Sequence, residues 1–278
     1  MGRWHIPRAA VAMKRAALVN LDERPSEQSP LREERSINRS AAPSPELKPE
    51  ETPEKAMRPR DPLAVDPTVT FTTSAGAFTV EFHVASSPVA VANVLDLVRT
   101  GFFNGLLVHR VVRSHGVQFG CPFTKSRRQR KDLFGRGGPK PHTPFPSATE
   151  AGVTLNRDKG GNVPDEFVSM TSNTARSVCL ASAPGERDSR GSQLFINTTD
   201  NTYLDWFDTT VPDVKLVVIG RVTKGWHTIN AIESMPVDED DVPDAEVTIT
   251  NAVIADDPLE HLKPKTPVEG AAEEANES

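Results

Sequence analysis

The residues best suited to chemistry stand in two short runs, far apart in the chain. Residues 108–122 hold Arg110 and, after a turn, Gln118. Their alternating pattern predicts two strands with both side chains on one face. In the second run, residues 191–196, Gln193 lies in a strand pattern, where its burial is unfavourable unless its amide is hydrogen-bonded. A guanidinium held by neighbours is a directed hydrogen-bond donor, able to stabilise an atom that gains electron density without forming a covalent bond.

The elements that must position these residues begin near residue 67. Alternating apolar residues around a turn at residues 74–76 predict a β-hairpin, and Pro88 predicts the start of a helix that Gly101 ends. The apolar stripe of that helix is Val91, Val94, Leu95 and Val98. Further strand patterns cover residues 177–181, 194–197, 216–222 and 247–254, and a short helix is expected over 226–235 with Trp226, Ile229 and Ile232 inward. Many short strands with two helices predict an all-β fold, a closed barrel with capping helices.

Two flanking segments differ from this domain in composition. Residues 1–21 contain Arg and Lys and no acid before Asp22, which favours a mitochondrial targeting segment, with an ordinary basic tail and a cytoplasmic protein as the alternative. The rest of the arm, to residue 66, is rich in Pro, Glu, Ser and Arg, and we expect it to be disordered or extended. Residues 256–278 form an acidic tail that we also expect to be disordered.

Composition excludes several classes of function. The net charge of −6 disfavours general nucleic-acid binding. Two cysteines, Cys121 and Cys179, make neither a disulfide framework nor a zinc pattern, and we expect both to be buried and reduced. We find no membrane span, because no apolar run approaches the roughly 20 residues that one needs. Nor do we find a metal site, a phosphate-binding loop or a nucleophile beside a base, so no cofactor is expected.

A sharply basic run stands inside an otherwise acidic chain. It covers residues 126–131 and belongs to a segment, about 123–161, that we interpret as an insertion; a second insertion is expected at about 206–213. Such a run is usually a solvated loop. The alternative is a contact with RNA phosphates or with an acidic protein.

The order and spacing of several motifs resemble the cyclophilins, a family of peptidyl-prolyl cis-trans isomerases, over most of residues 67–255. The motifs are Ala92-Asn93-Val94, Gly101-Phe102-Phe103-Asn104, Val108-His109-Arg110-Val111-Val112, Gly135-Arg136-Gly137-Gly138, Pro164-Asp165-Glu166-Phe167, Leu180-Ala181-Ser182-Ala183, Gly191-Ser192-Gln193-Leu194-Phe195-Ile196, Tyr203-Leu204-Asp205 and Val217-Val218-Ile219-Gly220. Each motif alone is weak, whereas their order together is specific.

The resemblance implies a closed antiparallel eight-stranded β-barrel with two helices, and isomerisation of X–Pro bonds in protein substrates. It implies that Arg110 donates to the proline nitrogen as the amide twists, and that Gln118 orients Arg110. The substrate-binding residues that it implies are His115, Ala181, Ser182, Ala183, Gln193, Phe195, Tyr203, Leu204 and Leu216. Residues 181–183 are expected to pair with the peptide as an added strand.

Departures from the family pattern cluster at the site. His115 and Gly116 replace a phenylalanine and a methionine, and Leu216 replaces a histidine. A glycine in place of a large apolar side chain removes roughly 1.5–3 kcal/mol of possible burial. Two functions therefore stay open. One is a prolyl isomerase of weakened activity acting on proline-containing segments; the other is a non-catalytic binding module, a subunit of a large protein or ribonucleoprotein assembly contacted through the arms and the basic insertion.

Overall fold

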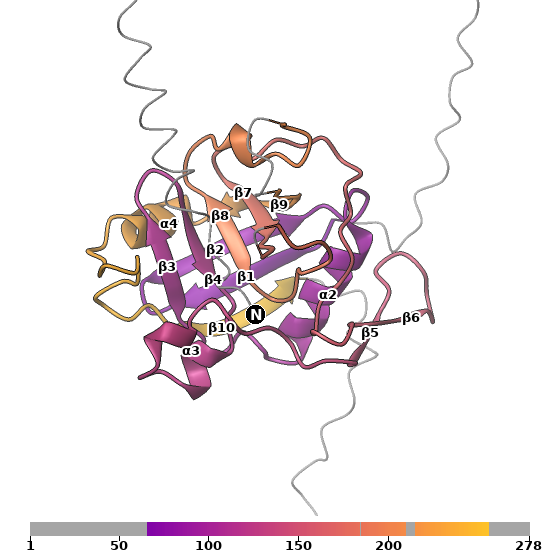
Figure 1. The fold of residues 1–278 in the computed structure, drawn as a ribbon, viewed down its shortest axis with the longest axis horizontal. Helices are drawn as coiled ribbons and strands as arrows, with labels where there is room; N and C mark the ends of the chain where they lie inside the picture. Colours follow the sequence, from indigo (N-terminus) through magenta and orange to yellow (C-terminus); the bar gives the residue numbers. More distant parts are fainter. Residues whose placement is uncertain (1–65, 184, 210–214, 256–278) are drawn as a thin grey trace, which may run out of the picture. The chain divides into compact units, whose positions relative to one another are not determined.

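The computed structural model describes residues 66–183, 185–209 and 215–255, shown in colour in Figure 1. The predictions for residues 1–21, for the rest of the N-terminal arm to residue 65, for the acidic tail and for residues 210–213 lie outside the described residues.

An eight-stranded antiparallel sheet forms the centre of the domain, in the order β10-β1-β2-β9-β7-β8-β4-β3. Its strands are β1 (Thr68–Thr73), β2 (Gly76–Phe82), β3 (Val108–Val112), β4 (Gly116–Phe119), β7 (Ser177–Leu180), β8 (Leu194–Asn197), β9 (Val218–Lys224) and β10 (Ile249–Ala255). A separate two-stranded sheet pairs β5 (Pro144–Pro146) with β6 (Thr154–Asn156). The helices are α2 (Pro88–Arg99), α3 (Phe123–Ser126), α4 (Trp226–Glu233) and the short 3-10 turns η1 (Lys131–Leu133) and η2 (Thr202–Leu204).

The sheet curls strongly, but a closed barrel is not confirmed. Its outer strands β3 and β10 are joined by one isolated bridge, between Leu107 and Thr248, instead of a continuous ladder among the described residues. Beside this bridge the Val108 N–H donates to the Val247 carbonyl at 2.9 Å. The fold is therefore a curled half-barrel whose two edges meet over a few residues.

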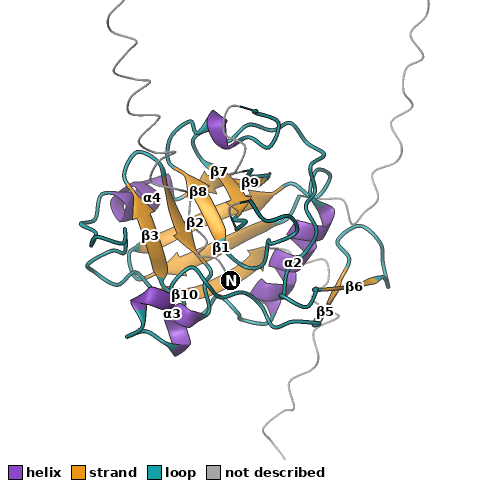
Figure 2. Cartoon of the chain, viewed as in Figure 1, coloured by secondary structure: helices purple, strands orange, loops and turns teal. Residues whose placement is uncertain are grey.

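The two predicted helices are confirmed and lie on opposite sides of the strands in the view of Figure 2. α2 begins with Pro88 after Ser87, and its predicted apolar stripe is buried. Gly101 follows the helix with a φ of 67°, a left-handed conformation that glycine adopts without strain. On α4, Ile229 and Ile232 are buried, while Trp226 is partly buried. α3 was not predicted.

A group of phenylalanine rings fills the inside of the curled sheet. Phe71 lies 5.3 Å from both Phe78 and Phe119, and 5.5 Å from Phe103, measured between ring centroids. Burying aromatic rings in this way contributes much of the stability of a core. The longest helix in the described part of the chain, α2, has 12 residues, and none there is long and apolar enough to cross a bilayer.

Candidate functional site

Arg110, Gln118 and Phe195 form a row across three neighbouring strands. Arg110 on β3 lies opposite Gln118 on β4, and Gln118 lies opposite Phe195 on β8. The next residues along the strands, such as Val117 and Ile196, belong to the hydrophobic core. Because successive side chains of a strand point to opposite faces, the row lies on the outer face of the curled sheet. Arg110 and Gln118 therefore share one face, as predicted.

The two glutamines are locked together. Gln118 Nε2 donates to Gln193 Oε1 at 2.9 Å. Gln193 Nε2 donates in turn to the carbonyls of Gly135 at 3.1 Å and Gly137 at 2.9 Å. Both side chains are buried, so these bonds satisfy polar groups that burial would otherwise leave unpaired. The prediction that Gln193 needs hydrogen-bond partners is confirmed.

Asp241 lies against the guanidinium of Arg110, and the sequence analysis missed it. Arg110 is 4% exposed, and its Nη2 lies 3.4 Å from Asp241 Oδ2. A main-chain hydrogen bond joins the same two segments, because the Val111 N–H donates to the Asp241 carbonyl at 2.8 Å. Asp238 shapes this loop by accepting the Val242 N–H at 3.0 Å. The acidic run at residues 238–241 was the only signal in the sequence.

Three rings form the wall beside this row. The His115 ring stacks on Tyr203 at 5.9 Å with an interplanar angle of 23°, and lies 5.6 Å from the Phe195 ring. The Tyr203 hydroxyl is 3.0 Å from His115 Nδ1. Burial raises the pKa of Tyr203, and the charge of Arg110 opposes that shift. His115 is buried, so it is a structural part of this wall.

Gly116 leaves no void beside these rings. A Cβ atom at residue 116 would lie 2.3 Å from Cζ of Phe195 and 2.6 Å from the Ile196 carbonyl oxygen. The Phe195 ring therefore occupies the space that a side chain at 116 would fill. The expectation that this glycine removes burial from a bound ligand stays a prediction, since the structure shows only that no empty space is left beside residue 116.

Within the described part of the chain, Ser182 is the residue of the predicted peptide-pairing segment whose main-chain N–H and C=O are both without a hydrogen bond. The Ala181 N–H donates to the Gln193 carbonyl at 2.8 Å, and the Ala183 N–H donates to Ser189 Oγ at 3.0 Å. Between them, the main-chain N–H and C=O of Ser182 make no hydrogen bond within the described part of the chain. An incoming strand could bond to both groups.

Leu204 and Leu216, also predicted to bind substrate, are buried and adjacent. The Leu216 N–H donates to the Leu204 carbonyl at 2.8 Å, and their exposed fractions are 2% and 0% respectively. They support the wall from beneath, and little of their surface is open to a ligand.

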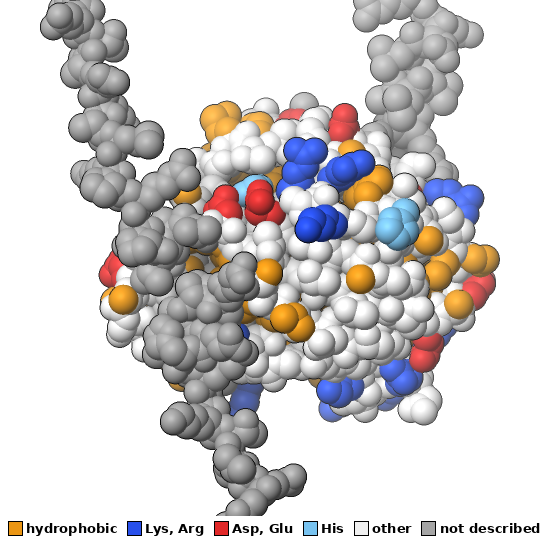
Figure 3. All heavy atoms as spheres, turned by 180° about the vertical axis from the view of Figure 1, so that it is seen from behind, with side chains coloured by type: hydrophobic (Ala, Val, Ile, Leu, Met, Phe, Trp, Pro, Cys, Tyr) orange, Lys and Arg blue, Asp and Glu red, His pale blue; other side chains and the backbone are white. Residues whose placement is uncertain are grey.

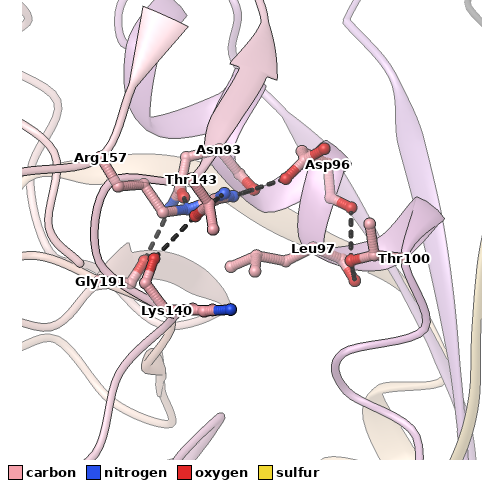
Figure 4. A network of polar contacts seen from close by, with 8 residues as sticks. All are labelled: Asn93, Asp96, Leu97, Thr100, Lys140, Thr143, Arg157 and Gly191. Carbon is pink, nitrogen blue, oxygen red and sulfur yellow. Dashed lines mark hydrogen bonds and ion pairs between the residues drawn. The ribbon is translucent and has the colours of Figure 1, made fainter.

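A buried arginine holds the turn that leads to Gln193 (Figure 4). Arg157 Nε donates to Asn93 Oδ1 at 2.8 Å, and Asn93 Nδ2 donates to the Gly191 carbonyl at 2.7 Å. Arg157 also pairs with Asp96 at 2.7 Å and donates to Thr143 Oγ1 at 2.9 Å. The segment that carries Arg157 and helix α2 thus fix the main chain two residues before Gln193. Sequence reasoning did not find this network.

The basic run is largely neutralised by the protein's own acids. Arg128 lies 3.5 Å from Glu246, and Lys131 lies 2.8 Å from Asp238, the residue that shapes the loop beside Arg110. Arg130 pairs with Asp132, its near neighbour, at 2.7 Å. In the space-filling view from behind, Figure 3, basic and acidic side chains also lie close together on the visible face. These pairs disfavour an RNA contact by this run.

One group of possible metal ligands occurs among the described residues. Asp66, Glu81 and His83 offer ligand atoms within 4.8 Å of one another, all on partly or fully exposed side chains. None of them belongs to the row of Arg110 and Gln118.

Comparison with known proteins agrees with this geometry. The model of the family described as cyclophilin type peptidyl-prolyl cis-trans isomerase/CLD matches residues 68–254. Peptidyl-prolyl cis-trans isomerase 10 of Caenorhabditis elegans is 29% identical over 69% of this chain and 97% of its own length. Cyp18 of Streptomyces antibioticus, another peptidyl-prolyl cis-trans isomerase, is 30% identical over 67% and 98%. The peptidyl-prolyl cis-trans isomerase-like 2 of Rhizopus delemar is longer, and the match spans 33% of it.

Solved structures show the same fold. A cyclophilin type peptidyl-prolyl cis-trans isomerase of Cryptosporidium parvum superposes with a TM-score of 0.53 at 22% identity, over 69% of this chain and 99% of its own. The same protein in the presence of the dipeptide Ala-Pro gives a TM-score of 0.52. The resemblance inferred from the motifs is confirmed: the chain belongs to the cyclophilin-type peptidyl-prolyl cis-trans isomerase family.

Proposed function

We propose that the protein catalyses the cis–trans isomerisation of X–Pro bonds in protein substrates, with Arg110 as the catalytic residue. The observation that carries this proposal is the row of Arg110, Gln118 and Phe195 on one face, with the Gln118 amide fixed by Gln193. Isomerisation must cross a barrier of ~18–20 kcal/mol, because resonance gives the amide C–N bond partial double-bond character.

The residues act on the twisted amide. As the C–N bond rotates, the proline nitrogen becomes pyramidal and gains a lone pair, to which a guanidinium N–H can donate. This hydrogen bond exists only in the twisted state, so it lowers the barrier without tightening the planar ground states. Gln118 lies opposite Arg110 across the two strands, and its role in this proposal is to limit the directions that the guanidinium can take. No proton is transferred and no covalent bond is made or broken, so no covalent intermediate is needed.

Substrate binding is supported by two further features. The main-chain N–H and C=O of Ser182, which are unbonded among the residues that the structure describes, offer two hydrogen bonds to an extended peptide. The Tyr203 ring, which is partly exposed and is supported from behind by the buried His115 ring, offers a surface against which a proline ring can pack.

The test is the rate of proline isomerisation in a short Ala-Pro peptide, measured by exchange spectroscopy. We expect the wild type to accelerate the exchange and Arg110→Ala to lose roughly 10²–10³-fold of that acceleration, as expected when a transition-state donor is removed. Arg110→Lys should not restore it, because an ammonium lacks the planar fork. Arg221→Ala, an exposed arginine on β9, is the matched control. Equal wild-type and Arg110→Ala rates at the uncatalysed level would refute the proposal.

A second candidate is a non-catalytic binding module. The observation that favours it is the burial of Arg110 against Asp241, because a substrate must compete with a carboxylate for the guanidinium. This role fits a subunit of a larger assembly, and a mitochondrial location would follow if residues 1–21 are a cleaved targeting segment. Binding of the Ala-Pro peptide without faster exchange, together with co-purification in a large complex, would support it. N-terminal sequencing of the native protein tests the targeting segment.

A further inference from the structure

A cavity of about 430 Å³ lies next to the segment proposed to pair with the peptide. Ser182 and Ala183 form part of its lining, so it adjoins the residue whose main-chain groups make no hydrogen bond to the other described residues. A strand advances about 3.3 Å per residue. A peptide bonded to Ser182 would therefore carry a neighbouring side chain past this cavity.

The lining of the cavity carries an excess of positive charge. Three basic residues, Arg187, Arg190 and Lys215, line it together with two acids, Asp165 and Glu186. This excess stands in a chain whose net charge is −6. A cavity lined with such an excess of positive charge attracts a negatively charged group, most strongly where walls of low polarity reduce screening.

Arg190 is a buried cation with an unused donor. It is 2% exposed; its Nη1 pairs with Asp165, and its Nη2 donates to the Lys215 carbonyl at 2.7 Å. Its Nε has no hydrogen-bond acceptor within the described part of the chain. At the surface, the side chain of Arg187 is 72% exposed, and its Nε lies 3.0 Å from Asp165 Oδ2. Asp165 thus balances one of these two guanidinium charges, which leaves the other for a ligand.

Aromatic rings hold both guanidinium groups in place. The Phe167 ring lies 4.8 Å from Arg187 Cζ and 5.3 Å from Arg190 Cζ. Trp206 stacks on Phe167 at 5.3 Å with an interplanar angle of 21°, and its indole N–H donates to the Ser169 carbonyl at 2.8 Å. Side chains fixed before binding lose less entropy when the ligand arrives.

From this arrangement we propose that the cavity is a second substrate subsite, which takes an acidic side chain close to the isomerised proline. The carboxylate of Glu or Asp and the phosphate of phosphoserine share the chemistry that Arg187 and Arg190 recognise. The inference rests on the proposed function only in placing the peptide at Ser182; it does not require that catalysis occurs.

The test uses short Ala-Pro peptides in which a single Glu is moved along the positions on either side of the Ala-Pro pair, each compared with its Gln counterpart. We expect one position at which Glu improves kcat/KM and the dissociation constant about tenfold over Gln, the size typical of a charge-assisted hydrogen bond. A phosphoserine peptide at the same position shows which anionic group fits better.

Two variants assign the preference to the cavity. Arg187→Gln should abolish the preference for Glu and leave the Gln peptide unaffected, because Asp165 keeps its pair with Arg190. Lys215→Gln should weaken the preference. Arg221→Gln makes the same change of charge on β9, outside the cavity, and should retain it.

The outcomes separate the two proposals. If the protein accelerates cis–trans exchange of the peptides, but Glu and Gln peptides have the same kcat/KM and dissociation constant at every position, the subsite is refuted and the isomerase stands. If Glu binds more tightly than Gln through Arg187 and no peptide exchanges faster, the subsite stands and the isomerase fails. A preference for Glu that persists equally in Arg187→Gln and Lys215→Gln also refutes the subsite.

Discussion

Replacing Arg157 by leucine should destabilise the domain more than any surface change. The guanidinium is 3% exposed and pairs with Asp96 at 2.7 Å. It also donates to Asn93 Oδ1 at 2.8 Å and to Thr143 Oγ1 at 2.9 Å. Leucine keeps apolar volume over the Phe145 ring, which lies 4.8 Å from Arg157 Cζ, so the change removes mainly the polar contacts.

The expected loss follows from the partners left behind. A charge-assisted hydrogen bond contributes about 1.5–3 kcal/mol and a neutral one about 1 kcal/mol. Breaking a buried ion pair by removing one partner costs about 3–5 kcal/mol. We therefore expect the free energy of unfolding to fall by about 3–5 kcal/mol, a large part of the 5–15 kcal/mol that is usual for a protein domain.

Urea denaturation followed by circular dichroism measures this loss. The midpoint should fall while the slope against urea stays constant, which separates a change in stability from a change in the surface exposed. Arg221→Leu, on the exposed side of β9, should change stability by less than about 0.5 kcal/mol. The catalysed cis–trans exchange of the Ala-Pro peptide should also become slower under native conditions, because Asn93 would hold the Gly191 carbonyl less firmly. A loss below about 1 kcal/mol for Arg157→Leu would refute this account of the network.

Three further outcomes follow from the site and its surroundings. Gly116→Ala should lower stability by about 1–3 kcal/mol and reduce peptide binding, because its Cβ would meet the Phe195 ring at 2.3 Å; a neutral effect on both urea denaturation and binding would contradict the packing. Burial raises the pKa of Glu166 above its usual 4.5, so its contribution to stability is full below that pH and is lost as the pH rises through the folded-state pKa. The free energy of unfolding of the wild type, measured by urea denaturation, should thus fall relative to that of Glu166→Gln between pH 4.5 and neutrality. A rise over the same range would contradict this prediction. Burial also raises the pKa of the Cys179 thiol, and Cys121 is buried too, so an aromatic disulfide reagent should label neither until the protein unfolds; rapid labelling of the native protein would count against this.

Local patterns in the sequence were enough to predict the main elements. The hairpin of β1 and β2 and helices α2 and α4 follow from apolar periodicity and from the positions of Pro88 and Gly101. The sequence predicted that Gln193 has hydrogen-bond partners, because a buried amide must be hydrogen-bonded. It could not predict that these partners include the carbonyls of Gly135 and Gly137.

Contacts between distant segments were beyond such reasoning. Arg110 and Asp241 stand 131 residues apart, and Arg157 and Asn93 stand 64 apart. No periodicity links such pairs, because the fold alone brings them together. The packing at Gly116 was beyond the sequence for a related reason, because only the fold shows that the Phe195 ring fills the space beside this residue.

The pairing of β1 with β10 constrains how the protein can be made. Thr68 faces Ala255, so the first strand of the domain finds this partner only after almost all of the domain has left the ribosome. Synthesis proceeds at about 5–20 residues per second, and pairings of such long range form slowly. Until then one edge of β1 has unpaired main-chain groups, which are able to pair with the strands of other nascent chains.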